Sequence, residues 1–176
     1  MSIEDEIKSY LESGLLIRIR QSFPGQPEKR VICASPAIVA LLDGPWNGDP
    51  KWEKRWNRVR QQIDEFIDGF FLERITVRSA PRKKSTCFMS LLDPEADEVW
   101  EIRCRDPKPG IRIFGSFVKQ NFFVALSVAP HECLSTEADW NRAIKQYRDE
   151  WHKHFSTAPF SGVYPHDYLT DAVVFD

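Results

Sequence analysis

Glu98 to Ala129 reads EVWEIRCRDPKPGIRIFGSFVKQNFFVALSVA, and this stretch decides the fold. Apolar and polar residues alternate within it, and two short turn-forming sequences, Asp106 to Gly110 and Gln120-Asn121, interrupt the alternation. A period of two is typical of strands, and strands joined by such short turns run antiparallel. The stretch therefore predicts an antiparallel β-meander within an α+β domain.

The first turn of the meander predicts its register. A four-residue turn from Asp106 to Pro109 would let Arg105 meet Gly110 across the two strands. Three further pairs would then face each other: Trp100 and Gly115, Ile102 and Ile113, and Arg103 and Arg112. A shift of one residue would bury arginines, so this is the register that we expect.

The same alternation divides the side chains between an apolar and a polar face. The predicted apolar face collects Trp100, Ile102, Cys104, Ile113, Phe122, Val124, Leu126 and Val128. The predicted polar face collects Glu101, Arg103, Arg105, Arg112, Phe114 and Phe123. Like charges that face each other destabilise a sheet unless an anion compensates them, so the arginines are the first indication of function.

Arginine forks match phosphate oxygens and aromatic rings stack on bases, a combination suited to single-stranded RNA. A basic loop that contains Arg82, Lys83 and Lys84 would add positive charge. An alternative is that Glu101 and acidic neighbours neutralise a face that is solvated or covered by a helix, and a third is a surface for a protein partner. The net charge of -2 gives no general attraction to nucleic acid, so binding would depend on a local patch.

Helical periodicity, capping residues and turn sequences place the remaining elements. We expect helices at residues 3–11, 35–43, 52–67 and 136–155, and further strands at 15–20, 31–33, 71–77 and 86–92. The predicted core is a meander of about four to five strands packed against helices. The chain would form a single domain over residues 1–176, with an N-terminal extension (1–45), a core (46–155) and a C-terminal tail (156–176).

Several classes of protein and site are not expected from this sequence. No apolar run approaches the roughly 18 residues that span a bilayer, and the first residues are acidic, so we expect a cytoplasmic protein without a membrane segment. The four cysteines form no Cys-x-x-Cys pair, and His152 and His154 would point in different directions from a helix. Nucleotide-binding and hydrolase motifs are missing from the sequence. We therefore expect no metal and no cofactor.

Three motifs of the meander resemble a known family. They are Val99-Trp100-Glu101-Ile102-Arg103, Gly110-Ile111-Arg112-Ile113-Phe114 and Phe122-Phe123-Val124-Ala125-Leu126. Together they resemble the RelE/HigB toxin superfamily, in its phage-related branch, over about residues 52–147. The resemblance implies a RelE-like core in which a helical pair precedes the meander and a further helix follows it.

The resemblance also implies an activity, namely a ribosome-associated endoribonuclease that cuts mRNA without a metal. Basic side chains would stabilise the phosphate while the ribose 2′-hydroxyl attacks it. By position, Arg112 and Arg103 match arginines of the family pattern, His131 matches a basic or proton-transferring residue after the last strand, and Glu101 could accept a proton. The family pattern carries a lysine pair where this chain reads Ala129 to Cys133.

The partners implied by the resemblance are mRNA, the ribosome and an antitoxin protein. Two other hypotheses stay open at this point. One is a non-catalytic RNA- or protein-binding module of phage or plasmid origin. The other is a protein whose N-terminal arm covers the sheet or binds a partner chain.

Overall fold

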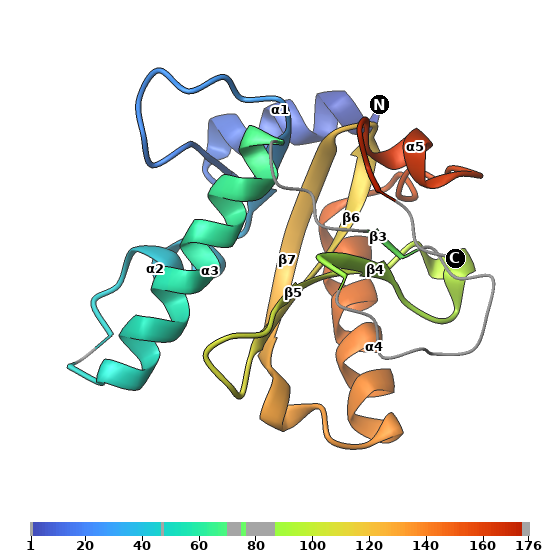
Figure 1. Cartoon of the computed structure of the whole chain (residues 1–176). Helices are drawn as coiled ribbons and strands as arrows, with labels where there is room; N and C mark the ends of the chain where they lie inside the picture. Colours follow the sequence, from blue (N-terminus) through green and yellow to red (C-terminus); the bar gives the residue numbers. More distant parts are fainter. Residues whose placement is uncertain (1, 47, 70–74, 77–86, 174–176) are drawn as a thin grey trace.

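The computed structural model describes residues 2–46, 48–69, 75–76 and 87–173 (Figure 1). Its centre is one mixed, mostly antiparallel sheet with the strand order β1-β2-β7-β6-β5-β4-β3. The strands are β1 (Ile17–Ile19), β2 (Val31–Ala34), β3 (Ile75–Thr76), β4 (Met89–Leu91), β5 (Trp100–Cys104), β6 (Ile111–Lys119) and β7 (Phe122–Pro130). The predicted α+β class is confirmed. The seven described strands exceed the expected four to five, because β1 and β2 continue the sheet beyond β7.

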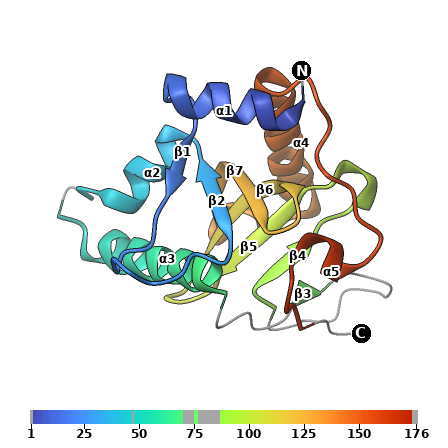
Figure 2. The same cartoon turned by 90° about the horizontal axis from the view of Figure 1, so that it is seen from above.

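Helices cover both faces of the sheet. They are α1 (Ile3–Ser13), α2 (Pro36–Asp43), α3 (Pro50–Asp68), α4 (Glu137–His154) and α5 (Pro165–Tyr168), with the short 3-10 helices η1 (Glu95–Asp97) and η2 (His131–Cys133). Figure 2 shows α3 and α4 on opposite sides of the sheet. We call these sides the α3 face, which α2 and α3 cover, and the α4 face, which α1 and α4 cover. No helix in the described ranges is long and apolar enough to cross a membrane.

The two long helices follow the expected sequence signals. Asp49 caps α3 by accepting a hydrogen bond from the backbone of Lys51, and Gly69 ends the helix at φ +73°. Its apolar stripe is buried in the core of the α3 face: Trp56, Val59, Ile63, Phe66 and Ile67. A capping box between Thr136 and Asp139 starts α4. Both helices therefore orient one stripe toward the sheet.

The register that the first turn predicts is present between β5 and β6. Trp100 lies opposite Gly115, Ile102 opposite Ile113, and Arg103 opposite Arg112. A side chain at Gly115 would collide with the ring of Phe123, so this glycine makes room for a ring from β7. Trp100, the cross-strand neighbour of Gly115, packs against Phe117.

The predicted faces of β7 are wrong along most of the strand. The pairing of β6 with β7 shifts by one residue between Phe114 and Gly115. Phe114 lies opposite Ser127 and Gly115 opposite Ala125, so the intervening residue of β7, Leu126, has no partner on β6. Such a β-bulge reverses the alternation of side chains beyond it. Phe123 and Ala125 therefore lie in the core of the α3 face. Phe122, Val124 and Leu126, which were predicted to share a face with Trp100 and Ile102, lie on the α4 face instead. Val128 keeps its predicted face.

The described segments near the two ends of the chain pack against the rest of the domain. Glu6 of α1 accepts hydrogen bonds from the backbone and side chain of Ser156, at 2.8 and 2.6 Å. The tail after α4 crosses the α3 face, where the Phe160 backbone donates to Phe117 and Tyr168 is buried in the core. The N-terminal segment and the tail are therefore packed parts of the domain that contains the meander.

Candidate functional site

Charged side chains gather on the α4 face, where β5 and β6 pair. We use the name arginine cluster for Glu101, Arg103, Arg105 and Arg112. A Glu101 carboxylate oxygen lies 3.1 Å from Nε of Arg112, and the other lies 3.4 Å from Nε of Arg103. The structure thus brings together three of the predicted catalytic residues, with the carboxylate between two guanidinium groups.

Strand register explains this arrangement. Arg103 and Arg112 are direct cross-strand neighbours, and Glu101 precedes Arg103 by two residues and so shares its face. Two guanidinium groups in this position repel each other, and the intervening carboxylate offsets the repulsion. The alternative interpretation from the sequence, in which Glu101 neutralises the arginines, is thus supported by these two contacts.

The two paired arginines differ in their access to solvent. The side chain of Arg112 is 6% exposed, and its Nη1 donates to the carbonyls of Ile111 and Cys104 at 3.3 and 3.5 Å. Burial lowers the pKa of Arg112, while Glu101 raises it and the neighbouring arginines lower it. The side chain of Arg103 is 22% exposed and donates to Sγ of Cys87 at 2.8 Å. Arg103 is therefore the better placed of the two to meet a ligand.

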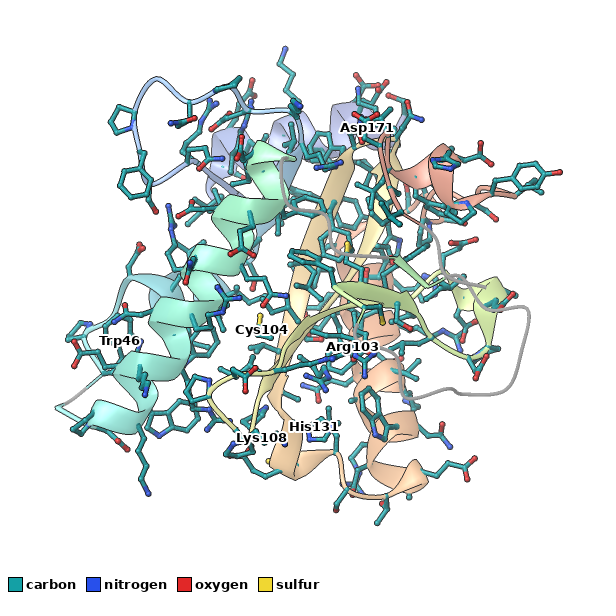
Figure 3. The ribbon with its side chains drawn as sticks, in the orientation of Figure 1. Trp46, Arg103, Cys104, Lys108, His131 and Asp171 are labelled. Atoms are coloured by element: carbon teal, nitrogen blue, oxygen red, sulfur yellow. The ribbon has the colours of Figure 1, made fainter. Side chains whose placement is uncertain are left out.

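His131 lies at the edge of the arginine cluster, in η2 directly after β7 (Figure 3). Its backbone N–H donates to the carbonyl of Gly110 at 2.8 Å, which holds η2 beside the start of β6. The pKa of the exposed imidazole is lowered first by partial burial and then by the charges of Arg112 and Arg103, while Glu132 raises it. The imidazole is therefore mainly neutral at neutral pH and can accept a proton.

Arg55 is a part of the site that sequence reasoning missed. It reaches from α3 around the end of the sheet, where its guanidinium forms a two-pronged ion pair with Glu132 at 2.9 and 3.1 Å. The same group donates to the carbonyls of Pro109 and Gly110 and lies 4.8 Å from the Trp52 ring centroid. Arg55 thus fastens η2 to the turn before β6. No sequence signal pairs two residues that lie 77 positions apart.

The two phenylalanines predicted to stack on bases are not accessible. Phe114 and Phe123 are 1% and 0% exposed, so neither ring can receive a base. Phe114 is covered because α4 packs over it, and Phe123 turns to the opposite face at the bulge. The aromatic ring near His131 is instead Trp140 of α4, which is half-buried and 6.4 Å from the imidazole between ring centroids.

The remaining predicted site residues are less well placed. Arg105 follows β5, is half-buried, and lies close enough to Arg112 to lower the pKa of that residue. Arg82, Lys83 and Lys84 lie outside the described residues, so the predicted basic loop stays a prediction. Glu101 already contacts two guanidinium groups, so His131 is better placed than Glu101 to take a proton.

Metal and thiol chemistry find little support among the described side chains. No group of three or more His, Cys, Asp or Glu residues in the described ranges could hold a metal ion. Cys33 and Cys104 are buried free thiols, Cys87 is buried, and Cys133 is exposed. Burial raises the pKa of Cys33 to about 11 and that of Cys104 to about 12. These two buried thiols are therefore unreactive at neutral pH.

The geometry offers a guanidinium pair, a neutral imidazole and a half-buried indole at one end of the α4 face. No family model, curated protein or solved structure matches the chain.

Proposed function

We propose that the protein is a relative of the RelE/HigB toxins that binds single-stranded RNA at the arginine cluster and cleaves it without a metal. The observation that carries the proposal is the position of His131, which directly follows β7 and lies two residues after Ala129, the cross-strand neighbour of Arg112. An imidazole that can accept a proton next to guanidinium groups that can hold a phosphate is suited to phosphodiester cleavage. Proposed partners are mRNA on the ribosome and an antitoxin protein.

In this mechanism Arg103 binds the phosphate. Arg112, the more buried of the two, adds positive charge next to Arg103. His131 takes the proton of the ribose 2′-hydroxyl, whose oxygen forms a bond to phosphorus while the bond from phosphorus to the 5′-oxygen breaks. The leaving oxygen takes a proton from water. Positive charge stabilises the phosphorane-like transition state, where negative charge develops on the phosphate oxygens. Glu101 keeps the two arginines at a fixed separation.

A second candidate is a module that binds RNA or a protein without cleaving it. The observation that favours it is the burial of Arg112, which is 5% exposed as a whole residue and already donates to two backbone carbonyls. A buried arginine fixed in this way can stabilise the sheet without meeting a substrate. The two candidates share the binding surface and differ in the role of His131.

Cleavage of a single-stranded RNA by purified protein, followed with and without EDTA, separates the candidates. We expect wild-type protein to cleave in both conditions, and His131→Gln to lower the rate by about two to four orders of magnitude with little change in RNA affinity. His152→Gln is the matched control, because His152 is exposed near the C-terminal end of α4.

Two substitutions of arginine complete the test. Arg103→Ala should weaken RNA binding, whereas Arg142→Ala, which removes an exposed arginine from α4, should leave it unchanged. Growth arrest on induced expression of wild type, lost in Arg112→Ala and in His131→Gln, would support the toxin assignment. Binding without cleavage by wild-type protein would favour the second candidate, and absence of both would refute the proposal.

A further inference from the structure

The site as described lacks a surface for a base, although a partly exposed aromatic ring lies next to it. The two phenylalanines predicted for this role are buried. Trp140 is the fourth residue of α4 and is partly buried against the core of the α4 face. Its ring contacts Phe114 on the sheet side and His131 on the site side, with centroid distances of 6.2 and 6.4 Å.

The position of Trp140 is fixed before any ligand arrives. The Thr136 hydroxyl accepts from the Asp139 backbone at 3.2 Å, and the Asp139 carboxylate accepts from the Thr136 backbone at 3.0 Å. Trp140 itself donates its backbone N–H to Thr136 at 3.2 Å. Both ring contacts are edge-to-face, at 82° with Phe114 and 71° with His131. A ring held from two sides loses little conformational freedom on binding, so it is preorganised for stacking.

We propose that Trp140 is the base-binding residue of the site and stacks on a nucleobase of a single-stranded ligand whose phosphate Arg103 holds. This inference rests on the proposed function and narrows its ligand to a nucleotide chain that carries bases. A bare phosphate or polyphosphate would meet the arginine cluster but not the indole. The net charge of -2 gives no general attraction to RNA, so stacking would supply affinity that overall charge does not.

The competing role for Trp140 is packing alone. The sequence places it in the apolar stripe of α4, and the structure confirms a contact with the α4-face core. Packing requires an apolar side chain of similar size, whereas stacking requires an aromatic ring. Trp140→Met and Trp140→Phe separate the two roles, because methionine retains much of the apolar volume and phenylalanine retains a ring.

The test measures binding of a 2′-deoxy oligonucleotide, which cannot be cleaved by 2′-hydroxyl attack, by fluorescence anisotropy at fixed salt. We expect Trp140→Met to weaken binding about tenfold and Trp140→Phe to recover most of it. Trp46→Met is the matched control, since Trp46 is a partly buried tryptophan that packs against the core of the α3 face (Figure 3). Its affinity should stay within about twofold of wild type, because it lies outside the site.

Two further measurements report separately on the indole and on the arginine cluster. The oligonucleotide should quench tryptophan emission in wild type and in Trp46→Met but much less in Trp140→Phe. Tripolyphosphate, which meets the arginine cluster alone, should have the same inhibition constant in wild type and in Trp140→Met.

Equal oligonucleotide affinity of wild type and Trp140→Met, with binding still lost in Arg103→Ala, would overturn the role of Trp140 and leave the proposed function standing. Failure of wild-type protein to bind the oligonucleotide would overturn both.

Discussion

The two faces of the sheet are formed by the same strands but bury different kinds of side chain. The α3 face is closed by aromatic rings that contact one another, among them Phe66, Trp100 and Phe123. Both faces also bury polar side chains, Arg30 beside Phe66 among them, but the α4 face buries an ion pair, that of Glu101 and Arg112. Buried ion pairs are often no more stabilising than apolar side chains of the same volume. The difference suggests that the α3 face serves stability and that the α4 face serves the site.

The largest effect on stability is expected on the α3 face. Phe66 is 0% exposed and lies between the rings of Phe88 and Phe123, at 6.4 and 6.1 Å. Phe66→Ala should lower the free energy of unfolding by about 4 kcal/mol, because it leaves a cavity in the core. Urea denaturation measures this, and Phe23→Ala is the control because Phe23 is 69% exposed. If the native Phe66→Ala protein also showed a changed His131 NMR shift, the two faces would not be separable.

A loss of about 3 kcal/mol is expected for Glu101→Gln on the α4 face. The substitution removes the carboxylate that both guanidinium groups contact, and breaking one side of a buried ion pair is strongly destabilising. Glu12→Gln, an exposed change on α1, should alter stability by less than about 0.5 kcal/mol.

The double variant Glu101→Leu/Arg112→Met adds the converse test. It replaces the buried pair by apolar side chains, so it should recover stability relative to Glu101→Gln while losing RNA binding or cleavage. A double variant that folds stably and retains full activity would contradict the assignment of the α4 face to the site.

Arg55 connects the two faces, and its loss should have an intermediate effect. Arg55→Leu removes the ion pair with Glu132 and the donors to Pro109 and Gly110, so we expect about 2 kcal/mol lower stability. Because η2 is then less well held, cleavage should fall more than RNA binding does. Arg55→Lys retains the positive charge but not the two-pronged guanidinium, so its stability and its cleavage rate should lie between those of wild type and Arg55→Leu. Arg142→Leu removes an exposed ion pair and serves as the control.

Sequence patterns predicted part of this molecule because local rules govern that part. The register of β5 and β6 follows from one short turn, and it placed Arg103 opposite Arg112 as observed. Capping residues likewise marked the start of α4.

The features that were missed depend on contacts between distant parts of the chain. At the bulge the ring of Phe123 on the next strand occupies the space beside Gly115, and the contact of Arg55 with Glu132 joins α3 to η2. Alternation along one strand does not show where a bulge reverses it. For this reason the pairing of Arg103 with Arg112 was predicted from the sequence, whereas the burial of Phe114 and Phe123 was not.

The smallest predicted effect is the pH dependence contributed by His131. Its pKa in the folded protein is lower than the ordinary value of 6.5, so the folded state disfavours the protonated imidazole. The stability linked to this group is therefore complete above about pH 6.5 and is lost as the pH falls toward the folded pKa. Since the imidazole is exposed, screening holds the effect below about 1 kcal/mol.

Urea denaturation between pH 7.5 and pH 5 should show a slightly larger loss of stability in wild type than in His131→Gln, while His152→Gln should follow wild type.

Titration of His131 by NMR adds a sharper test, because Glu132 is the neighbour that raises its pKa. Glu132→Gln should lower that pKa further and shift the acidic limb of any cleavage profile to lower pH. An upward shift in Glu132→Gln would show that Glu132 does not raise the pKa of His131 and would contradict this account of the imidazole.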